Sequence, residues 1–184
     1  MAALAKQRLN VDQFLVWAEG QIGRFELDDG EVIAMSPERA RHAETKYLVQ
    51  RSLERAIERA GLPCRMMPDG MTVRVDEYTA YEPDALVYCG SRIDGDDVEV
   101  RNPIIIVEVS SPSTRALDAA TKLAGYFRVA SVMHYLIVDP RRQIVIHHKR
   151  GVGEVIDTRI VATGRLNLSP PGLELDISEF FADA

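Results

Sequence analysis

The sequence predicts an α/β (α+β) fold, in which a mixed central β-sheet is flanked by helices and preceded by an N-terminal helix and hairpin. Two short runs, Pro103–Val107 and His134–Asp139, are almost wholly apolar and rich in β-branched residues, which is typical of strands buried on both faces. Residues 38–60 and 114–129 instead carry apolar side chains at helical spacing. Strands in the middle of the chain with helices around them favour a layered architecture.

Composition indicates one globular domain spanning residues 1–184. Of the 184 residues, 46% are hydrophobic and 27% charged, and the net charge of -6 argues against broad nonspecific coating of nucleic acid. No run approaches the roughly 18 apolar residues of a membrane helix, and the first ten residues are too polar for a secretory signal. Cys64 and Cys89 lack metal-ligand spacing, so we expect reduced core cysteines in a cytoplasmic protein without a membrane partner.

The first half of the chain predicts two helices and a hairpin before the strands begin. Asn10 is suited to cap a short helix that ends at Gly20, and Asp29-Gly30 is typical of a hairpin turn. Ser36 followed by a proline predicts the start of the long helix, which Gly61 ends. Extended segments are expected next, at residues 64–67, 71–75 and 82–89.

The second half predicts the centre of the sheet. The apolar run that starts at Pro103 is followed by the helix over 114–129, and then by the strand His134–Asp139. Residues 143–148 and 154–162 predict a hairpin of alternating or edge strands, and a short helix is expected around 178–181. His147–Arg150 forms a basic cluster that we interpret as a charged, solvated edge strand.

Glu108 is the residue that most needs a chemical explanation. In a strand, alternate residues share a face, so Glu108 continues the row of core side chains formed by Ile104 and Ile106. A lone carboxylate there costs several kcal/mol unless it is neutralised, paired or bound to a metal. Asp84 opens another apolar strand, and the two acids converge if those strands are neighbours. A turn residue at Asp84 and a buried salt bridge at Glu108 remain the alternatives.

Two converging carboxylates suit Mg²⁺, which binds oxygen ligands and activates water for phosphodiester hydrolysis. A positioned lysine would supply a third element, by orienting the nucleophile or stabilising the transition state. Lys122 lies on the helix that follows Glu108. Tyr126 lies one helical turn further and is a candidate for lining the same opening. His42, at the start of the long helix, either faces this cleft or is a satisfied core or capping residue.

These residues, in their order and spacing, carry a resemblance to a known family. Glu82-Pro83-Asp84, Glu108-Val109-Ser110-Ser111-Pro112-Ser113-Thr114, then Asp118, Lys122, Tyr126 and Tyr135–Pro140 together resemble the Uma-type restriction endonucleases of the PD-(D/E)XK nuclease superfamily, over about residues 25–148. The resemblance implies a restriction-endonuclease-like core and a deoxyribonuclease that uses Mg²⁺ (or Mn²⁺) held by Asp84 and Glu108. The lysine that usually follows the acid by two residues is replaced by Ser110, which implies that Lys122 takes its place. Glu82 is a further candidate for lining the site, and members of this superfamily often act on DNA as homodimers.

Other interpretations remain open. Asp118 and Lys122 form an acid-to-base pair at i,i+4 spacing, which commonly decorates a solvent-exposed helix face. The missing lysine beside Glu108 is also compatible with a catalytically inactive nuclease fold that serves as a nucleic-acid or protein interaction module. A third interpretation is a homo-oligomer without a nucleic-acid role, in which Glu108 is salt-bridged and Asp84 lies far away.

Overall fold

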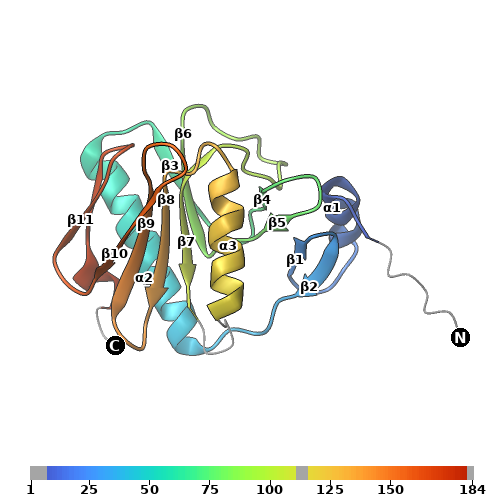
Figure 1. Cartoon of the computed structure of the whole chain (residues 1–184), viewed down its shortest axis with the longest axis horizontal. Helices are drawn as coiled ribbons and strands as arrows, with labels where there is room; N and C mark the ends of the chain where they lie inside the picture. The colour runs from blue at the N-terminus through green and yellow to red at the C-terminus, as the bar shows by residue number, and fades with distance from the viewer. Residues whose placement is uncertain (1–7, 111–115, 182–184) are drawn as a thin grey trace, which may run out of the picture.

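The computed structural model describes residues 8–110 and 116–181 (Figure 1). Their elements follow in chain order: α1 (Val11–Glu19), β1 (Phe25–Asp28), β2 (Glu31–Ala34), α2 (Ala40–Ala60), β3 (Cys64–Pro68), β4 (Val73–Arg74), β5 (Ala80–Tyr81), β6 (Ala85–Cys89), β7 (Pro103–Val109), α3 (Ala116–Arg128), β8 (His134–Asp139), β9 (Ile144–Arg150), β10 (Ile156–Val161), β11 (Arg165–Leu168), β12 (Leu173–Asp176) and the 3₁₀ helix η1 (Ile177–Phe180). No helix among these residues is long and apolar enough to cross a membrane.

A six-stranded mixed sheet forms the centre of the molecule, in the order β10-β9-β8-β7-β6-β3. The strands β7 and β8 are parallel, and every other neighbouring pair in this sheet is antiparallel. Parallel neighbours need a crossover connection, and α3 is the helix in that connection. The predicted α/β (α+β) fold with a mixed sheet is confirmed.

Helices cover both faces of this sheet (Figure 1). On one face, α2 packs with its buried residues Val49, Leu53 and Ala56 against a core that includes Val107 and Leu136. The β11–β12 hairpin and η1 pack on this same side through alternating leucines and Phe180; the sequence interpretation did not identify this hairpin. On the other face, α3 packs through Tyr126 and Phe127, which contact the cluster around Ile106 and Tyr135.

A smaller sheet lies beside α3 and carries the N-terminal segment, in the strand order β2-β1-β5-β4. The predicted Asn10 cap is present in α1. It forms a capping box, because Asn10 Oδ1 accepts a hydrogen bond from the Gln13 backbone and the Gln13 side chain accepts one from the Asn10 backbone. Asp29 and Gly30, with φ of 48° and 79°, form the predicted turn between β1 and β2. This sheet positions Glu26, which reaches the candidate site described below.

Three local expectations are wrong. The long helix begins at Ala40 with Arg39 as its N-cap, so Ser36 does not cap it. His147 and His148 are buried, because β9 lies between β8 and β10 and is not an edge strand. Cys64 and Cys89, which were expected to be reduced, form a disulfide in this structure.

The register of the sheet explains the disulfide. Cys64 in β3 lies directly opposite Cys89 in the antiparallel partner β6, with their Cα atoms 3.8 Å apart. Opposed residues of an antiparallel pair place their side chains on the same face, within reach of each other. The sequence spacing of the two cysteines does not reveal this register.

Candidate active site

Asp84 and Glu108 lie at the same end of the neighbouring strands β6 and β7. Ala85 pairs with Val107 in this ladder, so Asp84 directly precedes β6 at the level where Glu108 nears the end of β7. Asp84 is 5% exposed, and its Oδ2 accepts a hydrogen bond of 2.7 Å from the Val109 backbone N–H. Asp84 is thus held beside the residue that follows Glu108, unlike the third interpretation, in which the two acids lie far apart.

Glu108 contacts two side chains of α3, which follow each other at i,i+4 spacing. Its Oε1 accepts a hydrogen bond of 3.0 Å from Lys122 Nζ and one of 2.7 Å from the Tyr126 hydroxyl. Lys122 is 7% exposed and Tyr126 is completely buried, so Lys122 does not decorate a solvent-exposed face. The side chain of Asp118, its expected partner, lies outside the described residues. Instead, Lys122 Nζ makes its second contact, at 2.9 Å, with Glu26 Oε1 of β1.

The Lys122 ammonium group is therefore ion-paired with two carboxylates, Glu26 and Glu108. This shared pairing affects the pKa values of Glu108 and Lys122. Burial raises the pKa of Glu108 to about 7, and the negative charges of Asp84 and Glu26 raise it as well, whereas Lys122 and the Tyr126 hydroxyl oppose the shift. Burial alone would lower the pKa of Lys122, but the charges of Glu108 and Glu26 outweigh it and hold that pKa well above its usual value. Lys122 therefore keeps its positive charge near neutral pH, and Glu108 is the carboxyl whose pKa lies close to that range.

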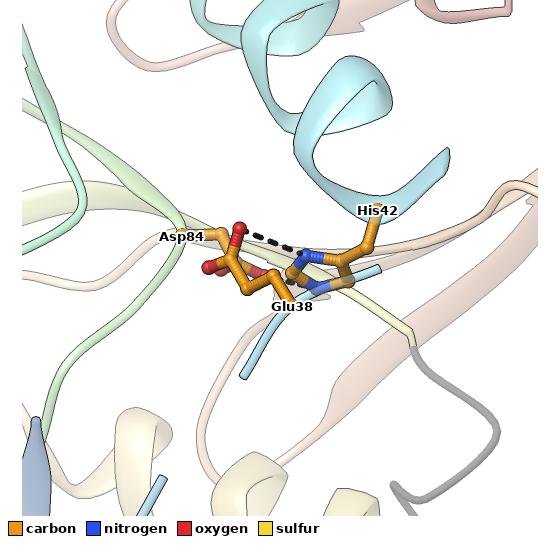
Figure 2. A group of neighbouring side chains, drawn as sticks. All are labelled: Glu38, His42 and Asp84. Carbon is orange, nitrogen blue, oxygen red and sulfur yellow. Dashed lines mark ion pairs between the residues drawn. The ribbon is translucent and has the colours of Figure 1, made fainter. Parts of the chain in front are cut away.

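His42 approaches Asp84 from the first turn of α2 (Figure 2). Its Nε2 lies 2.8 Å from the Val109 carbonyl oxygen and 3.5 Å from Asp84 Oδ2. Because a carbonyl only accepts, Nε2 carries the proton. Nδ1 lies 3.6 Å from Glu38 Oε2 without a hydrogen bond. The hydrogen bond to Asp84 raises the pKa of His42 despite the opposing effect of burial.

A second group of charges surrounds this side of the site. Lys46 Nζ contacts Glu38, lies 2.9 Å from Asp69 Oδ2 and is 4.0 Å from Asp84 Oδ1. Arg24 Nε donates a hydrogen bond of 2.7 Å to Glu82 Oε1. Glu82, predicted to line the site, is thus held by Arg24, while its backbone N–H donates to the Glu26 carboxylate at 2.9 Å.

The described residues contain one group of side chains suited to hold a metal ion: Glu38, His42 and Asp84, whose ligand atoms all lie within 4.8 Å of one another. Two carboxylates and an imidazole fit a divalent ion such as Mn²⁺, and the carboxylates alone fit Mg²⁺. Glu108, the second predicted ligand, is not part of this group and is turned toward Lys122.

Sequence reasoning missed Glu26, Glu38, Lys46 and Asp69. Only Lys46 had left a signal, since it falls near the apolar side of its helix and is 8% exposed in the structure. Glu26 and Asp69 became neighbours of the site through contacts across the chain, whereas Glu38 lies only four residues before His42.

An open cleft of about 820 Å³ lies between α3 and the N-terminal sheet, but it is not the candidate site. None of Asp84, Glu108 and Lys122 lines it. Its lining includes the acids Asp28, Asp29, Asp76 and Glu77 together with Arg8 and Arg128, which are ion-paired to Asp29 and Asp76.

Comparison with known proteins identifies the family. The family model Uma2, described as "Putative restriction endonuclease", matches residues 11–180. The chain belongs to the Uma2 family. The resemblance found in the sequence is thereby confirmed, and with it membership of a family described as nuclease-like.

Two relatives of this Uma2 chain span nearly its full length. An uncharacterized protein of Synechocystis sp. (strain ATCC 27184 / PCC 6803 / Kazusa) is 25% identical over 176 residues, which cover 95% of this chain and 92% of the relative. The crystal structure of a protein from Anabaena variabilis ATCC 29413, titled "a putative nuclease belonging to DUF820", superposes with a TM-score of 0.74 at 14% identity and covers 95% of this chain and 98% of its own. At that identity, the likeness shows a shared fold.

Proposed function

We propose that this Uma2 protein is a divalent-metal-dependent endonuclease that hydrolyses phosphodiester bonds in DNA. The observation that carries the proposal is the part-buried contact between Lys122 and Glu108, at the end of the sheet where Asp84 also lies. Buried acids next to a buried lysine are costly for stability, and such perturbed groups cluster at functional sites.

The residues have separate roles in this proposal. Asp84 and Glu108 hold the metal ion, and Glu38 and His42 are placed to complete its ligands beside Asp84. A bound Mg²⁺ or Mn²⁺ lowers the pKa of water and offsets the charge that develops on the phosphodiester. Lys122 stabilises that charge or orients the attacking water.

Glu26 has a positioning role. If Glu108 were to hold a metal ion, Lys122 would lose one of its two carboxylate partners. Glu26, 2.9 Å from Lys122 Nζ, remains and keeps the amine charged and in place.

The test is cleavage of supercoiled plasmid DNA by the purified protein with Mg²⁺ or Mn²⁺. We expect Asp84→Asn, Glu108→Gln and Lys122→Met each to lower the rate by roughly 100-fold or more, the usual effect of removing a group that stabilises the transition state. Asp96→Asn and Lys149→Met are matched controls outside the site and should cleave at the wild-type rate. Unchanged cleavage by Asp84→Asn and Glu108→Gln would refute the assignment.

One observation favours a second candidate, a catalytically inactive nuclease fold that binds nucleic acid or protein. Lys122 is neutralised on both sides, by Glu26 and Glu108, as in a structural ion cluster. Calorimetric titration with Mn²⁺ separates the two candidates. Binding that is lost in Glu108→Gln supports the enzyme, whereas absence of metal binding together with absence of cleavage supports the inactive module.

We further propose a cytoplasmic location, where DNA is accessible. Thiols are kept reduced in that compartment, so the Cys64–Cys89 pair is then open in the cell and closes on oxidation. Alkylation of thiols in freshly lysed cells tests this: modification of both cysteines is expected, and protection of both would contradict a cytoplasmic location.

A further inference from the structure

The edge strand β10 is exposed along almost its whole length. It is the terminal strand of the large sheet and pairs with β9 alone (Figure 1). Residues 156–160 are all exposed, including Ile160 at 68%, and Val155 before them is 58% exposed. An open edge with apolar side chains is a template for pairing with another strand, and natural proteins rarely leave one uncovered.

The sequence of this edge is complementary to itself. The order Ile156-Asp157-Thr158-Arg159-Ile160 is symmetric about Thr158, with an acid on one side matched by a base on the other. We propose that β10 pairs antiparallel with β10 of a second copy of this chain, with Thr158 on the two-fold axis. The two six-stranded sheets then form one continuous sheet.

Charge selects this register over its neighbours. In an antiparallel pair, two directly opposed residues either both point their backbone N–H and C=O groups at the partner strand or both point them away. Consecutive residues of a strand alternate in this respect, so residue i of one copy cannot lie opposite residue i+1 of the other. The two-fold axis therefore passes through a residue position and not between two residues. With the axis at Asp157, the Asp157 carboxylates of the two copies lie directly opposite each other. With the axis at Arg159, the two Arg159 guanidinium groups do. Like charges directly opposite each other destabilise the pairing of two strands. An axis at Thr158 instead opposes Asp157 to Arg159 twice and Ile156 to Ile160 twice.

The side chains that this register uses are free to take part. Within the described part of the chain, neither Asp157 nor Arg159 forms an ion pair, and both are exposed. The Thr158 hydroxyl is directed inward, where its Oγ1 lies 2.8 Å from His148 Nδ1, so it does not obstruct the axis. The strands β8 and β9 separate β10 from β7 and Glu108, so this interface is independent of the proposed nuclease site.

Sedimentation equilibrium of the full chain at concentrations up to about 1 mM tests the interface by charge exchange. We expect the wild type to dimerise. Asp157→Arg and Arg159→Asp should each raise the dimer dissociation constant by roughly tenfold or more, because two attractive pairs become repulsive. An equimolar mixture of these two single variants should dimerise again, since each strand then meets opposite charges. The double variant Asp157→Arg/Arg159→Asp should also dimerise.

The exposed acid Asp96 provides the control, and Asp96→Arg should dimerise like the wild type. The proposal is overturned by a wild type that stays monomeric, by a dimer that either single variant leaves intact, or by single variants that stay monomeric when mixed. Circular dichroism of each variant establishes that dissociation is not unfolding. Because none of these residues belongs to the nuclease site, plasmid cleavage by Asp157→Arg reports on the proposed function separately.

Discussion

Two buried histidines on the α2 face of the sheet, His134 and His147, predict a loss of stability in mild acid. Their rings share a hydrogen bond of 2.8 Å between His134 Nδ1 and His147 Nε2, and His134 Nε2 lies 2.7 Å from the Pro170 carbonyl oxygen. Because that carbonyl only accepts, His134 is protonated on Nε2 and accepts at Nδ1 from His147. A further proton could bind only at two nitrogens. His134 Nδ1 already accepts the hydrogen bond from His147, and His147 Nδ1 is buried without a hydrogen-bond partner.

Both rings therefore resist protonation. Burial lowers the pKa of each to about 4, although the hydrogen bond to the Pro170 carbonyl opposes the shift at His134. Lys149 lowers the pKa of both rings further, and Arg159 lowers that of His147. In the unfolded chain a histidine titrates near 6.5, so below that pH the unfolded state binds more protons and the free energy of unfolding falls as pH falls. Between pH 8 and pH 5, this amounts to about 2 kcal/mol for one histidine and up to about 4 kcal/mol for the pair.

The assay compares urea unfolding of the wild type and of His134→Gln/His147→Gln across this pH range. Other groups, including Glu108 and His42, titrate equally in both proteins, so their effect cancels in the difference. The double variant is expected to be less stable at pH 8, and the difference from the wild type should shrink by about 2–4 kcal/mol at pH 5. A difference that does not change with pH would refute the reasoning.

Two further predictions concern single contacts. Tyr126→Phe removes the hydroxyl that donates a hydrogen bond of 2.7 Å to Glu108. This substitution should lower the free energy of unfolding by about 1–3 kcal/mol, as expected for a hydrogen bond to a charged group. Tyr47→Phe, at an exposed tyrosine, is the control and should have no effect in the same urea titration. Reduction of the disulfide between Cys64 and Cys89, which are 25 residues apart, should lower stability by about 3 kcal/mol in the same assay, and equal midpoints with and without reductant would contradict it.

The sequence was sufficient to predict the elements whose pattern is local. The apolar β-branched runs of β7 and β8, the periodicity of α2 and α3, and the Asp29-Gly30 turn each report their own conformation. Glu108 was identifiable because a carboxylate within a row of core side chains requires a partner. The hairpin of β11 and β12 was missed, although its alternating leucines carry a strand signal.

The partners at the site could not be predicted, because they depend on contacts between distant segments. Glu26 is 96 residues from Lys122 in sequence, and only the docking of the small sheet against α3 brings them together. The i,i+4 spacing of Asp118 and Lys122 left open whether Lys122 faces solvent or the site. The Cys64–Cys89 disulfide was missed for the same reason, since the pairing of β3 with β6 is not encoded in either strand alone.

The balance of charge around the site is an argument for a cation there. The ion-paired groups at this end of the sheet comprise three basic side chains and six acidic ones: Arg24, Lys46 and Lys122, against Glu26, Glu38, Asp69, Glu82, Asp84 and Glu108. A proton on His42, whose pKa is raised, still leaves an excess of negative charge. A purely structural network gains most when its charges cancel, because each uncompensated buried charge is costly. In the function proposed above, a divalent ion beside Asp84 would offset that excess and would also allow a negatively charged phosphodiester to approach, which the acids alone would repel.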